Sequence, residues 1–324
     1  MSFDGSMTVC VTGAGGFIGS WLVNLLLQKD YTVRATVRNP EDPKNRHLKK
    51  LPGAEEKLTL WRADVLHRAG LAEAINGCDG VFHTASPVTN DQDKIVVAVE
   101  GTKNVLNIAA DAAVRRVVLT SSYGAVHMNP HRSPEDTVDE GCWSDLDFCR
   151  KTNNWYCYAK MMAEQAAWEI AEERGLNLMV VVPPVTFGPM LQPMLNDSGL
   201  HLAKYLSGRK KAFPNAVQGY VHVKDIAAAH ILVYETPSAG GRYLCIAEVL
   251  HRADLIGLLN EMFPQYPITN RCEDELSLRV KPYKFSNQRL IDLGLKFIPV
   301  KQAIYEMVVS LVENGHLPLI PSKI

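Results

Sequence analysis

The hydrophobic and polar positions of this chain follow two alternating periods over roughly its first half. Short apolar runs, several with period-two spacing, predict strands, and longer segments with helical spacing lie between them. Strands are expected over 8–12, 31–37, 58–63, 80–84, 115–121 and 178–182. Helices are expected over about 18–27, 99–113 and 156–170. Strands that alternate with helices predict a parallel sheet covered on both faces.

A glycine-rich turn follows the first strand, where Gly13, Gly16 and Gly19 recur at intervals of three. Glycine permits unusual backbone angles and lets a pyrophosphate approach the main chain. Free N–H groups at the start of the next helix then face the anion. An ordinary glycine-rich turn is the alternative, but the strand before it and the helix after it favour dinucleotide binding. The expected contacts are Gly13, Ala14, Gly15, Gly16, Phe17, Ile18 and Gly19.

Beyond residue 182 the pattern becomes irregular and rich in proline, which favours loops over a sheet edge. Apolar segments over 220–223 and 243–246 are expected to return to the main domain. We therefore predict an α/β protein with a Rossmann-type doubly wound parallel sheet and a smaller C-terminal substrate-binding lobe. The sheet domain would comprise 7–182 plus about 215–247, and the lobe about 183–214 plus 248–318.

Composition narrows the classes of protein. With 324 residues, 47% of them hydrophobic, the chain is long enough for a large core. A net charge of −1 indicates neither a nucleic-acid nor a membrane partner. Seven cysteines without zinc-ligand spacing are typical of buried thiols in a reducing cytoplasm, with no metal site. The polar segment Met1–Met7 is not expected to be a signal peptide.

The end of the second strand carries the residue that distinguishes two dinucleotides. An acid there bonds the ribose 2′-hydroxyl of NAD, whereas an arginine accommodates the 2′-phosphate of NADP. Arg38 occupies this place, and Lys44 follows six residues later. Two cations near one phosphate bind it better than one. The pair predicts NADP(H), although Arg46, Lys49 and Lys50 nearby also fit a solvated basic loop.

Further cofactor contacts are expected where other strands end, because ligands of parallel sheets bind at the carboxyl ends of the strands. Asp64 can accept from an adenine amino group, or it can cap the following segment. Small residues after the fourth strand would let the cofactor lie across the strand ends. The expected set is Asp64, Val65, Thr84, Ala85 and Ser86.

A candidate catalytic group follows the fifth strand. Ser122 stands at its carboxyl end, and Tyr156 and Lys160 are four apart on one helix face. Hydride transfer to a carbonyl needs a proton donor for the developing alkoxide. The Lys160 ammonium is expected to lower the pKa of Tyr156 and to hold a ribose, and Ser122 to orient the carbonyl oxygen. Tyr158 is the competing acid, but it has no lysine at this spacing.

The run Asn154-Trp155-Tyr156-Cys157-Tyr158-Ala159-Lys160 closely resembles the Asn-Trp-Tyr-Cys-Tyr-Gly-Lys signature of plant cinnamoyl-CoA reductases, in the extended short-chain dehydrogenase/reductase superfamily. The resemblance runs almost end to end and includes Val81–Val88, Asp139–Asp145, Lys281–Asn287 and Gly315–Pro318. Such enzymes reduce hydroxycinnamoyl-CoA thioesters to aldehydes with NADPH, on the route to lignin monomers. The resemblance therefore implies an acyl-CoA substrate and leaves the oligomeric state open.

The resemblance implies further site residues. It extends the cofactor contacts to Pro183, Pro184, Val185, Thr186 and Ser198. It places the CoA phosphates near three basic residues, His201, Lys204 and Arg252. For His201 and Lys204, the alternative is a solvated helix face. It also implies that Cys149 and Cys157 are a candidate redox pair, with two independent buried thiols as the alternative.

Three features depart from the family pattern. Ala159 replaces a glycine, which is expected to add a methyl beside the catalytic face; Tyr123 stands where an isoleucine is usual; and 182–187 carries an extra proline. Two alternatives follow: a dihydroflavonol-reductase-like ketone or aldehyde reductase, and a divergent cinnamoyl-CoA-reductase-like protein with another substrate. The intact Ser122, Tyr156 and Lys160 argue against a third, a non-catalytic NADP-binding sensor.

Overall fold

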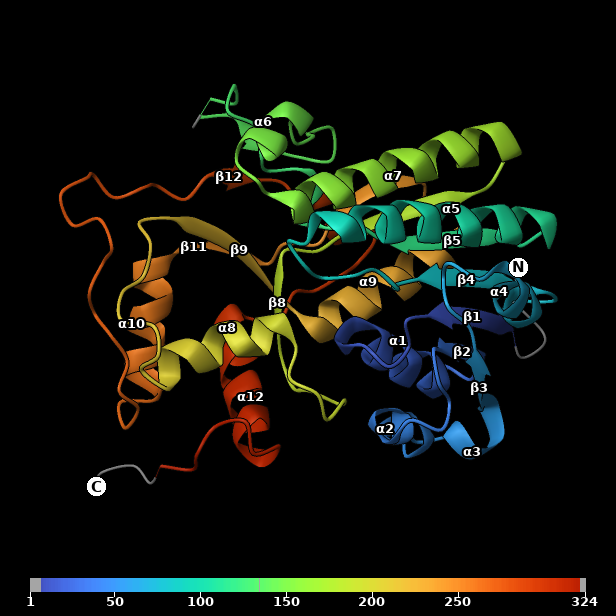
Figure 1. Ribbon diagram of the computed structural model, residues 1–324, viewed down its shortest axis with the longest axis horizontal. Coiled ribbons are helices and arrows are strands. Elements are labelled where there is room, and N and C mark those ends of the chain that lie inside the picture. The colour runs from blue at the N-terminus through green and yellow to red at the C-terminus, as the bar shows by residue number, and fades with distance from the viewer. Residues whose placement is uncertain (1–6, 134, 321–324) are drawn as a thin grey trace.

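Seven parallel strands form the centre of the protein (Figure 1). The computed structural model describes residues 7–133 and 135–320. Most of the segment 1–7, which is not expected to be a signal peptide, lies outside the described residues. The strand order is β3-β2-β1-β4-β5-β7-β10, and all neighbours are parallel. The strands are β1 (Thr8–Thr12), β2 (Thr32–Val37), β3 (Leu58–Arg62), β4 (Gly80–His83), β5 (Arg116–Thr120), β7 (Leu178–Val182) and β10 (Gly241–Leu244).

The six strands predicted from the pattern are therefore present, and the predicted doubly wound α/β fold is confirmed. The three predicted helices are α1 (Phe17–Gln28), α5 (Ile95–Asp111) and α7 (Trp155–Arg174). Helix α7 is longer than predicted because both of its ends are well capped. Asn154 accepts from the Cys157 N–H at 3.2 Å, and Gly175 ends the helix in the left-handed region at φ 65°.

Two hydrophobic clusters cover the two faces of the sheet, since successive strand residues point to opposite sides. Val9 and Val11 belong to the cluster with α1 and α9 (Val223–Glu235). Cys10, between them, belongs to the cluster with α4 (Arg68–Ile75), α5 and α7. Figure 1 shows α5 and α7 above the sheet and α1 below it. Because both faces are covered, ligands can enter only at an edge or at the strand ends.

A second lobe lies beside the carboxyl ends of the strands (Figure 1, left). Its three-stranded sheet has the order β11-β9-β8, with β8 (Val185–Phe187), β9 (Val217–His222) and β11 (Glu248–His251). A separate hydrophobic cluster joins this sheet to α8 (Asp197–Leu206), α10 (Arg252–Met262) and α12 (Val300–Glu313).

The two apolar segments expected to return to the main domain take different places. The segment 243–246 enters β10 of the central sheet, whereas Val221 and Val223 pack in the hydrophobic cluster on one face of that sheet. Most of 220–223 lies in β9, which pairs with β8 and β11. The chain leaves β7 through Pro183 and Pro184, and β8 then begins a new sheet. The division into two domains stays a prediction.

Smaller elements complete the described chain: α2 (Arg46–Lys49), α3 (Ala54–Lys57), α6 (Leu146–Lys151), α11 (Gln288–Asp292), and the paired strands β6 (Thr137–Val138) and β12 (Lys284–Phe285). Within 7–133 and 135–320, no helix is both long enough and apolar enough to span a bilayer. The same residues contain no cluster of three or more His, Cys, Asp or Glu side chains suited to a metal ion.

Candidate active site

A cavity of about 1000 Å³ opens at the carboxyl ends of the central strands, between the sheet and the second lobe. The strand order reverses between β1 and β4, which is where open α/β sheets bind ligands. The cavity brings together most of the predicted site residues: Gly13, Gly15, Gly16, Phe17, Ile18, Gly19, Arg38, Lys44, Asp64, Val65, Thr84, Ala85, Ser86, Ser122, Tyr156, Lys160, Pro183, Pro184, Val185, Thr186, Ser198 and His201. Four predicted residues are not among those that line it: Ala14, Lys204, Arg252 and Cys149.

The glycine turn packs against the loop after β4. Gly13 has φ 68°, and a Cβ on it would lie 2.8 Å from the Cα of Ala85. A Cβ on Gly19 would overlap the carbonyl oxygen of Gly13. Only glycine fits these two places, so the backbone itself forms this wall of the cavity. The start of α1 opens toward the same space, which suits a pyrophosphate.

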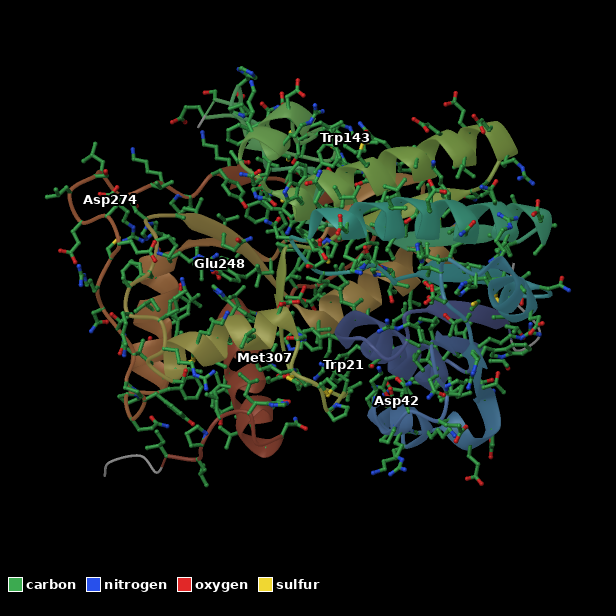
Figure 2. All side chains as sticks on the ribbon, in the orientation of Figure 1. Trp21, Asp42, Trp143, Glu248, Asp274 and Met307 are labelled. Carbon is green, nitrogen blue, oxygen red and sulfur yellow. The ribbon has the colours of Figure 1, made fainter. Side chains whose placement is uncertain are left out.

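The cations expected to bind a phosphate stand at the mouth of the cavity. Arg38 and Lys44 are both exposed and line it. The Lys44 ammonium forms a 2.9 Å ion pair with Asp42, and this hydrogen-bonded partner lowers the pKa of the Asp42 carboxyl. Asp42, labelled in Figure 2, is therefore an anion beside the place proposed for a phosphate. Sequence reasoning did not find this carboxylate.

Asp64 caps a turn and also lines the cavity, and its contact with an adenine stays a prediction. Its Oδ1 accepts from the N–H of Leu66 at 2.9 Å, as a residue that caps a turn does. The side chain also lines the cavity at the end of β3. Val65 beside it packs close to Gly101 of α5, where a Cβ would come within 2.7 Å of Cγ2.

Ser122, Tyr156 and Lys160 meet at the centre of the cavity. Strand β5 delivers Ser122, and α7 places the other two one turn apart. The Tyr156 hydroxyl donates to Oγ of Ser122 at 3.2 Å. The buried Lys160 ammonium donates to the carbonyl oxygen of Thr120 at 3.1 Å. This arrangement can transfer a proton to an oxygen held beside Ser122.

The electrostatics of the pair differ from the expectation. Burial raises the pKa of Tyr156 above its ordinary value, and the hydrogen bond with Ser122 opposes that rise. Burial also lowers the pKa of Lys160 to about 8, while the charge of Glu164 raises it. Lys160 is not among the groups that shift the pKa of Tyr156, so the expected lowering of this pKa by Lys160 is wrong. Desolvation dominates because the Tyr156 hydroxyl is buried.

The residues expected at the CoA phosphates form a different kind of group. Arg252 Nη1 donates to Nε2 of His201 at 2.7 Å and to the Tyr220 hydroxyl at 2.6 Å, and Nη2 donates to Gln218 at 3.3 Å. Burial, reinforced by the Arg252 charge, lowers the pKa of His201 to about 3. His201 is thus a neutral acceptor, and its expectation as a basic residue is wrong. Lys204 lies exposed one turn later on α8.

Cys149 and Cys157 are both buried free thiols. Burial raises the pKa of Cys157 to about 12, and the nearby Cys149 raises it further. Their pairing stays a prediction.

The departure at Ala159 lies away from the cavity. Ala159 packs with Ala98 and Ala163 between α5 and α7, so the expected methyl beside the catalytic face is wrong. Tyr123 does line the cavity, and its ring stacks on His127 at 4.9 Å and on Tyr283 at 5.7 Å.

Several lining residues were missed by sequence reasoning, among them Asn154, His127, Asp197 and Gln218. The helix-capping preference of asparagine was a usable signal for Asn154. The other three lie in segments without a motif, and only the tertiary fold brings them together.

Comparison with known proteins agrees with this geometry. Residues 9–246 match the model of the NAD dependent epimerase/dehydratase family. The chain is 63% identical to cinnamoyl-CoA reductase 1 of Petunia hybrida, over 97% of this chain and 95% of that protein. The crystal structure of vestitone reductase from alfalfa is similar with a TM-score of 0.83 and 33% identity, covering 96% of this chain and 99% of that one. Yeast methylglyoxal/isovaleraldehyde reductase Gre2, solved with NADPH, has a TM-score of 0.80 and 28% identity, covering 96% and 99%.

Proposed function

Because the chain belongs to the NAD dependent epimerase/dehydratase family, and within it to the cinnamoyl-CoA reductases, we propose that it reduces hydroxycinnamoyl-CoA thioesters to aldehydes with NADPH. It is an NADP-dependent oxidoreductase, and its place is in the formation of lignin monomers. The observation that carries the proposal is the Tyr156 to Ser122 hydrogen bond, beside the buried Lys160, in a cavity walled by the glycine turn.

The residues of the cavity fit a phosphorylated dinucleotide. The glycine turn presents backbone without side chains to the cavity, which would let a pyrophosphate approach the main chain. Arg38 and Lys44 would hold the 2′-phosphate, and Lys160 the nicotinamide ribose. The bound cofactor supplies the hydride that reduces the thioester carbonyl.

The side chains of this site would bind the carbonyl oxygen of the thioester and transfer a proton to and from it. The Ser122 hydroxyl would hold the carbonyl oxygen, and the Tyr156 phenol would protonate the oxyanion that forms there. The product of this step is a hemithioacetal. Tyr156 then takes the proton back as the carbonyl re-forms and the C–S bond breaks, which releases CoA as a thiolate and leaves the aldehyde.

The binding of CoA is assigned to the rim of the second lobe. Lys204 and Arg252 supply the positive charge there, and neutral His201 orients the Arg252 guanidinium through their hydrogen bond. Binding energy from this remote part of the substrate would position the reacting carbonyl. We also place the enzyme in the cytoplasm, an assignment that the seven free thiols support.

A ketone reductase of the dihydroflavonol type is the second candidate, because the fold also resembles that of vestitone reductase. NADPH oxidation distinguishes the two: feruloyl-CoA should be reduced, with coniferaldehyde as product, and dihydroquercetin should not. Reduction of dihydroquercetin with no turnover of feruloyl-CoA would reverse the assignment. A Tyr156→Phe variant is the control for non-enzymatic oxidation.

A further inference from the structure

Glu164 is a buried carboxylate outside the set of residues that the reaction uses. It lies on α7 one turn after Lys160, which lies one turn after Tyr156, so the three side chains share a helix face. Its exposed fraction is 1%. A buried carboxylate is costly unless it is paired and hydrogen-bonded, so its partners indicate its role.

Four donors satisfy the Glu164 carboxylate. Arg242 donates from Nε to Oε1 at 2.6 Å and from Nη2 to Oε2 at 3.3 Å. The Ser121 hydroxyl donates to Oε2 at 2.5 Å, and the indole N–H of Trp168 donates to Oε1 at 3.3 Å. Ser121 immediately precedes Ser122. The carboxylate therefore connects the catalytic helix to the chain segment that carries the catalytic serine.

Arg242 is itself held from three sides. It lies on β10, the edge strand of the central sheet. Its Nη1 donates to the carbonyl oxygens of Glu140 and Cys142 at 2.8 and 2.7 Å. Its guanidinium lies 3.9 Å from the ring of Trp143, which Figure 2 labels near the α6–α7 region. A guanidinium fixed in this way holds the carboxylate of Glu164 in one position.

The surroundings of Lys160 contain little other charge. Burial keeps His83 of β4 and His230 of α9 neutral, with pKa values of about 3 and about 4. On α5, which packs against α7, Glu100 and Lys103 form an exposed pair with each other. Tyr156 on α7 is a neutral phenol. Among the described residues, Glu164 is the group whose charge favours the ammonium form of Lys160.

We propose that Glu164, fixed by Arg242, is a positioning residue that holds the Ser121–Ser122 segment after β5 against the catalytic helix and places a negative charge one turn from Lys160. This proposal rests on the proposed function, in which the Lys160 ammonium binds the ribose of NADPH. Without the Glu164 charge, Lys160 loses its proton at lower pH, and the binding of NADPH weakens at lower pH as well.

The test measures the dissociation constant of NADPH by fluorescence between pH 6.5 and 10. Wild-type affinity should fall above a pH of about 8, where Lys160 loses its proton. Glu164→Gln keeps the shape of the side chain and should move this fall at least about 1 pH unit lower, because a neighbouring opposite charge shifts a pKa by about this much or more. Glu306→Gln, which removes the carboxylate paired with His222, is the matched control and should leave the fall in place.

This binding readout needs no thioester. Failure of wild type to reduce feruloyl-CoA would therefore overturn the proposed function without deciding the role of Glu164. If Glu164→Gln does not fold because Arg242 is left unpaired, the double variant Glu164→Gln/Arg242→Met removes both charges. It should show a smaller shift in the same direction, because loss of the more distant Arg242 cation offsets part of the loss of the carboxylate. Ser121→Ala keeps the Glu164 charge and should lower the melting temperature without a shift. An unchanged pH profile in the folded Glu164 variant, or an equal shift in either control, overturns the proposal.

Discussion

The hydroxyl of Tyr156 donates to Oγ of Ser122 across 3.2 Å, although 34 positions separate the two residues along the chain. The same Oγ accepts from the N–H of Gly124 at 3.0 Å. With two acceptor sites in use, the proton of the Ser122 hydroxyl is left to donate to a substrate oxygen. Ser122 therefore contacts the proton donor Tyr156 and can also donate to the oxygen that Tyr156 would protonate.

The first prediction follows from this geometry. Tyr156→Phe keeps the ring and removes the proton donor, so NADPH should still bind while kcat falls by about 10²–10⁴-fold. Lys160→Ala should weaken NADPH binding as well as lower kcat. Steady-state kinetics with feruloyl-CoA and a cofactor titration separate the two effects. Near-normal kcat in Tyr156→Phe would move the acid role to Tyr158 or to water.

The second prediction concerns the choice of cofactor. Arg38→Ala should weaken NADPH binding about tenfold or more and leave NADH binding nearly unchanged, because it removes a hydrogen bond to a charged phosphate. Asp42→Asn should have the opposite sign and tighten NADPH binding, since it removes an anion paired with Lys44. Dissociation constants of both cofactors test this. An unchanged ratio of the two in Arg38→Ala contradicts the assignment.

The sequence predicted the central sheet well because each strand is an apolar run between helices of regular period, and the glycine spacing lies between the first strand and helix. The strand β8 was not predictable in the same way, since its three residues follow two prolines and carry no periodic signal. Its place depends on β9, which lies about 35 residues further along the chain.

The pKa shifts of the site residues were less predictable than which residues form the site. The spacing of Tyr156 and Lys160 indicated their proximity, but the direction of the Tyr156 pKa shift depends on burial by the whole fold. Histidine is a basic residue type, but His201 is neutral in the structure because its pKa is lowered to about 3. The cause is burial by the tertiary fold, reinforced by the charge of Arg252, 51 positions away, whose guanidinium donates to His201.

The third prediction is a pH dependence of stability. Burial raises the pKa of Asp225 from 3.8 to about 7, although the hydrogen bond from the Ile298 N–H and the charge of Lys224 both oppose this rise. The native state therefore favours the protonated carboxyl, a contribution that is fully present below about pH 4 and is lost as the pH rises through about 7. Asp225→Asn should lessen the fall in melting temperature between pH 5.5 and 8. Asp42→Asn, at a half-buried carboxyl whose pKa is lowered by Lys44, is the control, and the same fall in wild type and Asp225→Asn would refute the prediction.

The fourth prediction concerns the two buried thiols Cys149 and Cys157. Burial raises the pKa of Cys149 and Cys157, and the thiolate is the reactive form. A crosslink between them should therefore form slowly at pH 7 and faster at pH 9 under mild oxidation. Mass spectrometry of the digested protein detects the crosslinked peptide, with Cys157→Ser as the control. Absence of this peptide at both values of pH ends the redox-pair hypothesis.

The last prediction separates the binding of CoA from the chemistry. The phosphates of CoA lie far from the reacting carbon, so residues that contact them should change substrate affinity and not proton transfer. Lys204→Ala should raise KM for feruloyl-CoA and leave kcat nearly unchanged, because this exposed lysine has no role in the cavity itself.

Arg252→Ala should have a larger effect than Lys204→Ala, since it also removes the donor that orients His201, Tyr220 and Gln218. His201→Asn offers a second comparison, because it retains a hydrogen-bond acceptor and, like the native neutral histidine, carries no charge. It should therefore raise KM less than Arg252→Ala does. The decisive measurement uses a truncated feruloyl thioester that lacks the nucleotide: its kcat/KM should be the same in wild type and Lys204→Ala. Equal losses on both thioesters would mean that these residues support the fold or the reaction, and the CoA assignment would then be wrong.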